Sequence, residues 1–257
     1  MKTTALFLSA FGLLPLMTSM PAPAQSPSSP LIEASVQLDL TRQTEMRYLV
    51  YLPPDYHPAG GTTWPLMLFL HGAGERGTNL SRVAIHGPPS LVKQGTNFPF
   101  LIVAPQCPEG QRWENDPLVR LLDHVTRQYA VDPSRIYLTG LSMGGYGTWK
   151  LGLMYPEKFA ALVPICGGGE FIDALLVSRD KPAAFKSLPV WAFHGAKDPV
   201  VPLDESKRMV NLLRNLGVAE VKFTVYPEAN HNSWAETYLN PELYTWLLKH
   251  RRAGAKP

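Results

Sequence analysis

The sequence predicts a single α/β domain built on a mostly parallel sheet. Its 257 residues are 45% hydrophobic and 18% charged, which is enough apolar material for one sizeable core. Strand-like and helix-like patterns alternate along most of the chain. The strand-like runs are short and nearly all apolar, as in strands that are buried on both faces. Alternation of this kind favours right-handed crossovers between parallel strands.

Eight strand-like and four helix-like runs carry this prediction. A polar turn, 41–45, joins the first two strand-like runs. The expected strands are 34–40, 46–53, 65–70, 100–104, 135–139, 161–165, 190–194 and 221–226. The expected helices are 117–130, 143–155, 204–216 and 237–250. We expect no large lid domain, because the 167–189 insertion is only about twenty residues long.

Residues near the helix ends support two of these helices. Asp204 and Glu205 stand in the first turn of the third helix, where acidic groups favour a start, and Gly217 follows its last residue. Pro241 lies early in the last helix, where its missing N–H is tolerated.

The first 24 residues have the pattern of a secretory signal. Lys2 gives a positive start, an apolar stretch covers 5–16, and small residues precede an expected cleavage after Ala24. Residues 25–32 then read as a flexible leader, and 33–257 as one catalytic domain. The remaining sequence has no apolar run of ~18 residues, so no membrane-spanning helix is expected there. We therefore expect a periplasmic or secreted protein.

Net charge bears on the possible partners, and the positions of the two cysteines bear on whether a disulfide forms. A net charge of +3 without a Lys/Arg run gives no reason to expect nucleic acid or an anionic membrane as a partner. Cys107 and Cys166 follow strands that we expect to lie three positions apart, roughly 14 Å, whereas a disulfide needs Cα atoms within about 7 Å. We expect two separate, semi-buried thiols, although the loops leave a bridge open. Oligomeric state is also left open.

The strongest chemical motif is G-x-S-x-G at 140–144. It follows a predicted strand and opens a predicted helix, with Ser142 at its centre. The pattern is typical of a sharp strand-to-helix turn, in which glycines remove side chains that would clash and the serine hydroxyl is lifted above the sheet. Ser142 is thus the candidate nucleophile.

A serine hydroxyl needs a base, and that base needs a carboxylate partner. His231 lies in a polar loop after the last strand and is our candidate base. The other histidines have weaker claims: those that end strands suggest a structural role, and the rest have no supporting pattern (His71 and His194; His57, His86, His124 and His250). Asp198, after the strand 190–194, is the candidate acid, with Asp204 as its rival. The order Ser, Asp, His differs from the two common protease orders.

Backbone N–H groups should bind the oxyanion of the intermediate. We expect one from Met143, directly after Ser142, and one from the loop after 65–70, with Ala73 preferred and Gly74 second. That loop, 72–77, also matches the dinucleotide pattern G-x-G-x-x-G. No acidic residue occurs from 76 to 108, however, and Pro88-Pro89 interrupts the expected phosphate-binding helix, so we expect no dinucleotide site. No cofactor or metal motif is present in the sequence.

Taken together, these segments resemble the α/β-hydrolase superfamily, and most closely its small secreted esterases. That group includes feruloyl esterases, acetylxylan esterases and poly(hydroxybutyrate) depolymerase-like enzymes. The matching stretches are 70–77, 104–108 with Trp113, 140–149, 163–169, 193–202 and 228–234, within a resemblance covering about 45–250. The resemblance implies an eight-stranded, mostly parallel sheet flanked by helices. It also implies that Ser142, Asp198 and His231 are nucleophile, acid and base.

The expected function is that of a secreted serine carboxylic-ester hydrolase acting on short-chain or aromatic acyl esters, including esters of plant polysaccharide. We expect four side chains to border its pocket: Gln106, Trp113, Trp149 and Trp234. One alternative is a serine peptidase of the prolyl-oligopeptidase type, although the chain has no propeller-sized N-terminal region. The other is a non-catalytic binding protein on a hydrolase scaffold.

Overall fold

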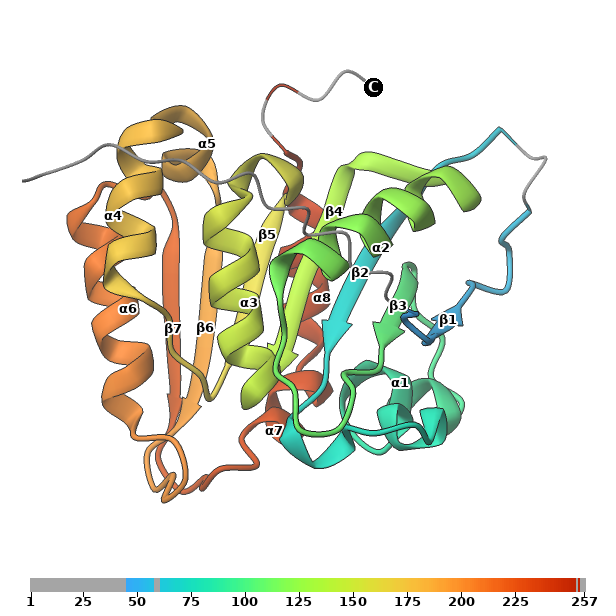
Figure 1. The fold of residues 1–257 in the computed structure, drawn as a ribbon, viewed down its shortest axis with the longest axis horizontal. Coiled ribbons are helices and arrows are strands. Elements are labelled where there is room, and N and C mark those ends of the chain that lie inside the picture. The colour runs from blue at the N-terminus through green and yellow to red at the C-terminus, as the bar shows by residue number, and fades with distance from the viewer. Residues whose placement is uncertain (1–44, 58–60, 253, 255–257) are drawn as a thin grey trace, which may run out of the picture. The chain divides into compact units, whose positions relative to one another are not determined.

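A computed structural model describes residues 45–57, 61–252 and 254, and shows a seven-stranded sheet among them (Figure 1). The strand order is β1-β3-β2-β4-β5-β6-β7, with β1 antiparallel to β3 and every other pair parallel. The strands are β1 Tyr48–Tyr51, β2 Trp64–Leu70, β3 Leu101–Pro105, β4 Val131–Leu141, β5 Ala161–Ile165, β6 Val190–Gly195 and β7 Val221–Tyr226. The mostly parallel sheet is thereby confirmed. The predicted strand 34–40, the signal 1–24 and the leader 25–32 lie outside the described residues.

Helices cover both faces of this sheet (Figure 1). They are α1 Gly87–Lys93, α2 Asn115–Gln128, α3 Met143–Met154, α4 Phe171–Asp180, α5 Pro182–Ser187, α6 Leu203–Asn215, α7 Trp234–Leu239 and α8 Pro241–Lys249. The core on one face includes buried residues of α2 to α6, and the core on the other includes those of α7 and α8, with α1 packed against it. The domain is therefore three-layered, with the sheet in the middle.

Strand β2 shows why the parallel strands are so apolar. Leu66, Leu68 and Leu70 pack into the core on the α3 side, whereas Met67 and Phe69 pack into the core on the α8 side. All five are at most 1% exposed. Burying each such side chain stabilises the fold by about 1.5–3 kcal/mol, so both faces of the strand must be apolar.

The predicted helix 237–250 is wrong in extent, because the chain forms two helices there. Helix α7 ends at Leu239, and α8 begins at Pro241. Asn240 has extended backbone, and its side-chain oxygen accepts a hydrogen bond of 2.9 Å from the N–H of Glu242. This cap, followed by a proline in the first helical position, starts a new helix rather than continuing the old one.

The short insertion behaves as predicted. Residues 167–189 form only α4 and α5, so no large lid is present in the described part of the chain. Pro88 and Pro89 lie in the first turn of α1, which begins at Gly87, instead of interrupting a helix.

The two thiols are free, and they are fully buried rather than semi-buried: Cys107 is 1% and Cys166 0% exposed. Both follow strands in the apolar interior, and these strands, β3 and β5, lie three positions apart in the sheet as expected. Burial raises the pKa of Cys107 to about 11 and that of Cys166 to about 12. Both thiols therefore keep their protons at neutral pH, and neither is a nucleophile.

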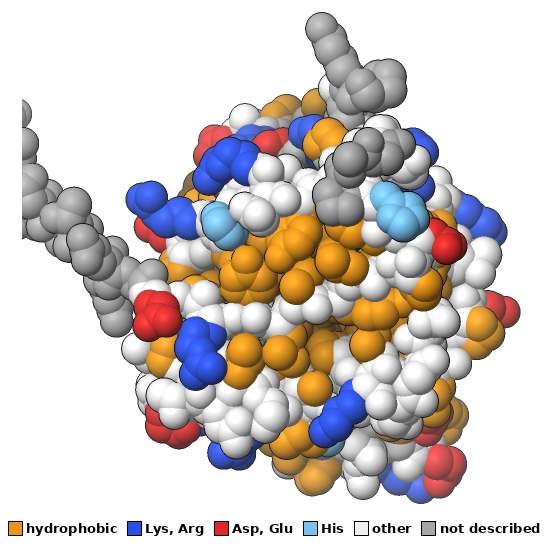
Figure 2. Space-filling model, turned by 90° about the vertical axis from the view of Figure 1, so that its right-hand side faces the viewer, with side chains coloured by type: hydrophobic (Ala, Val, Ile, Leu, Met, Phe, Trp, Pro, Cys, Tyr) orange, Lys and Arg blue, Asp and Glu red, His pale blue; other side chains and the backbone are white. Residues whose placement is uncertain are grey.

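The β1 edge of the sheet is an apolar side of the molecule. Figure 2 views the side on which β1 lies in Figure 1, and hydrophobic side chains gather across the middle of that face. Val50 on β1 and Leu52 just after it are exposed apolar residues. Among the described residues, no helix has the length and apolar character needed to cross a bilayer.

Candidate active site

The turn at Ser142 has the strained geometry that its glycines predict. β4 ends at Leu141, α3 begins at Met143, and Ser142 between them has φ 52° and ψ −117°. This left-handed backbone is rare outside glycine and marks a constrained turn. A Cβ on Gly140 would overlap the carbonyl of Gly144, and one on Gly144 would overlap that of Leu70. Glycine is therefore required on both sides of the serine.

The carboxyl edge of the sheet brings three distant residues together. Ser142 follows β4, Asp198 follows β6 and His231 follows β7. The Nε2 atom of His231 lies 2.9 Å from Oγ of Ser142, and its Nδ1 atom lies 2.8 Å from Oδ2 of Asp198. Nδ1 therefore carries a hydrogen that it donates to the carboxylate, which leaves the Nε2 lone pair facing the serine hydroxyl.

Asp198 is held as an anion inside this edge. Its side chain is fully buried, and its Oδ1 atom accepts hydrogen bonds of 2.8 and 2.9 Å from the N–H groups of Val200 and Val201. Burial alone would raise the pKa of Asp198, but the hydrogen bonds from His231, Val201 and Val200 outweigh it and lower that pKa. Asp204, its rival in the sequence, lies exposed on α6, 3.7 Å from Lys207.

These contacts form a chain through which a proton can move. The carboxylate orients the imidazole and stabilises it when it becomes charged, and the imidazole can accept the serine proton. The side chain of His231 is 19% exposed, so solvent and ligands reach the Ser142 end of these hydrogen bonds. The arrangement suits nucleophilic attack by Ser142 on a carbonyl.

The loop after β2 approaches Ser142 closely, as an oxyanion loop would. A Cβ on Gly72 would lie 3.0 Å from Leu141 and 3.7 Å from Cβ of Ser142. Ala73 and Gly74 follow, both exposed, in a short 3₁₀ helix that ends at Glu75. Met143 is the first residue of α3, whose N-terminal N–H groups have no partner within the helix. No α-helix follows the glycine loop directly, unlike in a dinucleotide site.

His71 supports this loop from beneath. It is fully buried, its Nδ1 atom lies 2.6 Å from the carbonyl of Gly72, and its Nε2 atom accepts a hydrogen bond of 3.0 Å from the N–H of Cys107. Nδ1 therefore carries the hydrogen. Burial lowers the pKa of His71 to about 4, so the ring is neutral. The structural role expected for His71 fits these contacts.

Three of the four expected pocket residues have buried side chains. Trp149 is 0% exposed on the inner side of α3, and Trp113 is 4% exposed, with its indole N–H donating to the carbonyl of His71. The Gln106 amide N–H₂ donates to the carbonyls of Glu75 and Asn79. These side chains contact the loop after β2 or the core on the α3 side, and their place at the edge of a substrate pocket stays a prediction. For Trp149, sequence spacing alone does not distinguish the two faces of α3.

Trp234, the fourth expected pocket residue, lies beside the candidate base His231. It begins α7, is half-buried, and its ring packs edge-on to His231 at 5.2 Å between centroids. The ring of His86 also lies beside the Trp234 ring, at 5.5 Å between centroids. Trp234 is thus the expected pocket residue that contacts the catalytic candidates.

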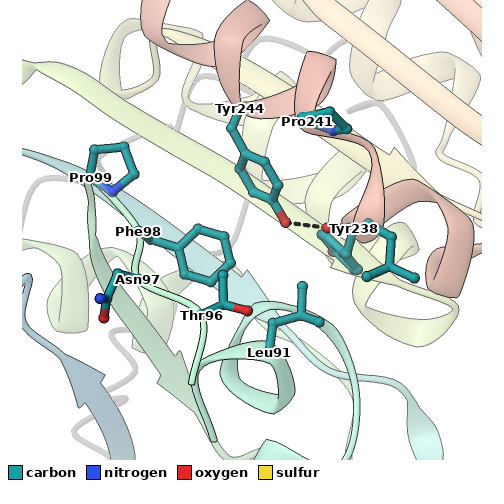
Figure 3. A pocket seen from close by; sticks show the side chains of 9 residues that line it. Leu91, Thr96, Asn97, Phe98, Pro99, Tyr238, Pro241 and Tyr244 are labelled. Carbon is teal, nitrogen blue, oxygen red and sulfur yellow. Dashed lines mark hydrogen bonds between the residues drawn. The ribbon is translucent and has the colours of Figure 1, made fainter. Parts of the chain in front are cut away.

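A separate cavity of about 320 Å³ (Figure 3) has none of Ser142, Asp198 and His231 in its lining. Its lining residues come from α1, the loop before β3, and the junction of α7 and α8: Leu91, Thr96, Asn97, Phe98, Pro99, Tyr238, Leu239, Pro241 and Tyr244. The hydroxyl of Tyr244 donates to the carbonyl of Tyr238 at 2.6 Å. Burial raises the pKa of both tyrosines further above neutrality, so the cavity lining offers no acid or base for catalysis.

One group of side chains has the composition of a metal site. The potential ligand atoms of Cys166, Asp198 and His231 lie within 4.8 Å of one another. Asp198 and His231 are already hydrogen-bonded to each other, and the buried thiol keeps its proton. We therefore assign these groups to hydrogen bonding rather than to metal ligation.

Sequence reasoning missed the part that His194 and Ser206 take beside Asp198. Nε2 of His194 lies 3.3 Å from Oδ2 of Asp198, and its Nδ1 atom lies 2.7 Å from Oγ of Ser206. All three side chains are buried. The four-residue spacing of His194 and Asp198 was the available signal, but the His-Gly pair pointed only to a structural strand end.

Comparisons with known proteins point to one superfamily. Residues 115–240 match the phospholipase/carboxylesterase family. The chain is 31% identical over 216 residues to acyl-protein thioesterase 1 of Gibberella zeae, covering 72% of this chain and 91% of that protein. It is 26% identical over 208 residues to a bifunctional acetylxylan esterase/xylanase of Neocallimastix patriciarum, covering 77% of this chain but only 27% of that longer protein.

A solved structure agrees with these sequence matches. The crystal structure of a thermostable esterase is 33% identical, with a TM-score of 0.68, over 83% of this chain and 61% of that one. Fold, sheet order and relatives are thus consistent with one another. The chain belongs to the α/β-hydrolase superfamily.

Proposed function

We propose that this protein is an exported serine esterase in which Ser142, His231 and Asp198 act as nucleophile, base and acid. The observation that carries the proposal is the unbroken hydrogen-bond chain from Ser142 through His231 to a buried Asp198, with lengths of 2.9 and 2.8 Å. The strained turn at Ser142 supports it, because it exposes the hydroxyl at the N-terminal end of α3.

The reaction has two halves. Oγ of Ser142 forms a bond to the ester carbonyl carbon while Nε2 of His231 takes the hydroxyl proton, and the carbonyl oxygen becomes an oxyanion. The N–H of Met143, together with that of Ala73 or Gly74, binds this oxyanion. The intermediate then breaks its bond to the alcohol oxygen, which receives the proton from His231. Water repeats the sequence on the acyl-enzyme and releases the acid.

The surroundings of the site favour small or aromatic acyl groups. No large lid is found in the described residues, and Trp234 offers an aromatic wall beside His231. Apolar side chains stand exposed near the site: Tyr146 on α3 and Val200 two residues after Asp198. The relative from Neocallimastix patriciarum, a bifunctional acetylxylan esterase/xylanase, suggests that the alcohol belongs to a sugar.

Thioester hydrolysis is a second candidate, because the relative from Gibberella zeae is an acyl-protein thioesterase. The same residues perform both reactions, since a thiolate leaves instead of an alkoxide. Amide cleavage by a prolyl-oligopeptidase-type enzyme has no comparable support among these relatives. A purely binding role conflicts with the enzymatic relatives.

A panel of substrates tests the proposal. Acetyl, butyryl and feruloyl esters, an acyl thioester and a peptide amide should be compared for the wild type, Ser142→Ala, and Ser187→Ala, which changes a surface serine. We expect ester turnover to exceed amide turnover, and Ser142→Ala to lose about 10³-fold or more in kcat while Ser187→Ala loses nothing. Unchanged turnover in Ser142→Ala, or faster amide cleavage, would refute it.

Export is tested separately. We infer that the signal at 1–24 is removed after Ala24, supported by its charged start and small-residue cleavage site. Protein recovered from the periplasm or medium should begin at Gln25. Mature protein that retains residues 1–24 would contradict this inference.

A further inference from the structure

His194 is a second histidine in contact with the buried carboxylate. It lies in β6 with 0% exposure, between the turn that carries Asp198 and the first turns of α6. Its Nε2 atom is 2.9 Å from the carbonyl oxygen of Val201 and 3.3 Å from Oδ2 of Asp198. Its Nδ1 atom is 2.7 Å from Oγ of Ser206.

These neighbours determine where the ring carries its hydrogen. Nε2 faces only oxygens that accept, a carbonyl and a carboxylate, so it must carry a hydrogen. Nδ1 faces the hydroxyl of Ser206, which can donate or accept, and this hydroxyl also lies 2.9 Å from the carbonyl of Gly167. His194 therefore presents an N–H to the Asp198 side whether or not Nδ1 is also protonated.

The same N–H ties down the turn around Asp198. It donates to the carbonyl of Val201, and the N–H of Val201 donates to Oδ1 of Asp198 at 2.9 Å. The other carboxylate oxygen, Oδ2, accepts from His231 and lies against the His194 N–H. His194 thus connects α6, through Ser206, to both oxygens of the carboxylate.

We propose that His194 is a positioning residue for the ester hydrolysis proposed above: its Nε2–H holds the Asp198 turn in place and offsets part of the carboxylate charge that His231 senses. The inference rests on the proposed roles of Ser142, Asp198 and His231. It assigns His194 a part in the reaction beyond packing at the end of β6.

Loss of this N–H should affect His231 in two ways. Without it, the Asp198 charge is less compensated and favours the protonated form of His231, so the base is lost at higher pH. The turn is also released, which misplaces His231 against Ser142. Other titratable or charged groups lie around Asp198 and His231. They are Cys166 after β5, Tyr146 on α3, and the hydrogen-bonded Glu205 and Arg208 on α6. They remain unchanged in the variants below.

Two variants of similar volume separate donation from packing. Gln can place an N–H near the position of Nε2, whereas Met fills the space and donates nothing. We expect His194→Met to lower kcat by about tenfold or more, with little change in KM, and to move the acidic limb of kcat/KM up by about half to one pH unit. His194→Gln should restore the wild-type limb and most of kcat.

Rates should be normalised to active sites counted with a fluorophosphonate, so that partial unfolding does not count as lost catalysis. An acidic limb that stays at the wild-type pH in folded His194→Met would overturn the proposal. So would a His194→Gln variant as impaired as His194→Met. Ser142→Ala, measured beside them, separates the two levels: if it keeps full activity, the proposed function fails, whatever His194 does.

If His194→Met does not fold, a measurement on the unaltered protein still tests the proposal. In ¹H–¹⁵N spectra of histidine-labelled enzyme at about pH 7, the Nε2 atom of His194 should carry a hydrogen. The signal is assigned by its absence from His194→Gln. A ring with Nε2 unprotonated could not donate to Val201, and this result would overturn the proposal by itself.

Discussion

The neutral, buried His71 should make the protein lose stability in mild acid. Burial lowers the pKa of His71 to about 4, an effect that the hydrogen bond to Gly72 opposes and the nearby Arg76 reinforces. In the unfolded chain, a histidine titrates at about 6.5. Between these two values the unfolded state binds a proton that the folded state does not bind. The free energy of unfolding therefore falls as pH falls through this window.

The size of the effect follows from the two pKa values. Relative to neutral pH, the difference amounts to about 2 kcal/mol at pH 5 and about 3 kcal/mol at pH 4. These values are a large part of a typical domain stability of about 5–15 kcal/mol. The ring is fully buried, so little of the effect is screened by solvent.

Urea unfolding between pH 7 and pH 5 measures this contribution of His71 to the free energy of unfolding. His71→Gln should lose less stability over this range than the wild type, by about 2 kcal/mol, because the titrating group is gone. His124→Gln, which removes an exposed histidine of α2, controls for the substitution and should follow the wild type. Burial also lowers the pKa of His250, but that residue is present in all three proteins and cancels. Equal slopes for His71→Gln and the wild type would refute the reasoning.

Four further substitutions probe the sheet-to-helix turn, an ion pair and the site. Gly144→Ala would overlap the Leu70 carbonyl and should cost about 3 kcal/mol or more in urea unfolding, whereas Gly74→Ala, which meets open space, should cost under about 1 kcal/mol. Burial opposes ionisation of Asp132, but hydrogen bonds from Ser134 and Arg135 outweigh it and hold its pKa at about 2. Its stabilisation is therefore present above about pH 4 and lost towards pH 2, so Asp132→Asn should lose about 2 kcal/mol at pH 7 and show a flatter acid dependence. Asp198→Asn should lower kcat by about 10⁴-fold per folded active site, and a drop below tenfold would argue against its role.

Local chemistry made much of the fold predictable. Alternating apolar runs indicate the parallel strands, and G-x-S-x-G indicates the strained turn, because glycine and helix-start rules act within a few residues. The meeting of Ser142, Asp198 and His231 in space is also predictable. Each residue follows a strand, and parallel strands end at one edge of the sheet.

The remaining features depend on information that the local pattern does not contain. Trp149 lies five residues after the G-x-S-x-G motif and Trp113 lies in the loop after β3, but only tertiary packing decides that both face the core. The break at Asn240 depends on a side-chain cap that competes with helix continuation. The neighbours of His194 lie 7 and 12 residues further along the chain, beyond any local motif.

The most direct test of the central claim is the site and rate of covalent labelling. A fluorophosphonate should modify the folded protein once, on the peptide that contains Ser142, as located by mass spectrometry. His231→Gln should label at least about 10³-fold more slowly, since nothing then accepts the serine proton. An adduct on another residue, or undiminished labelling in His231→Gln, would contradict the account.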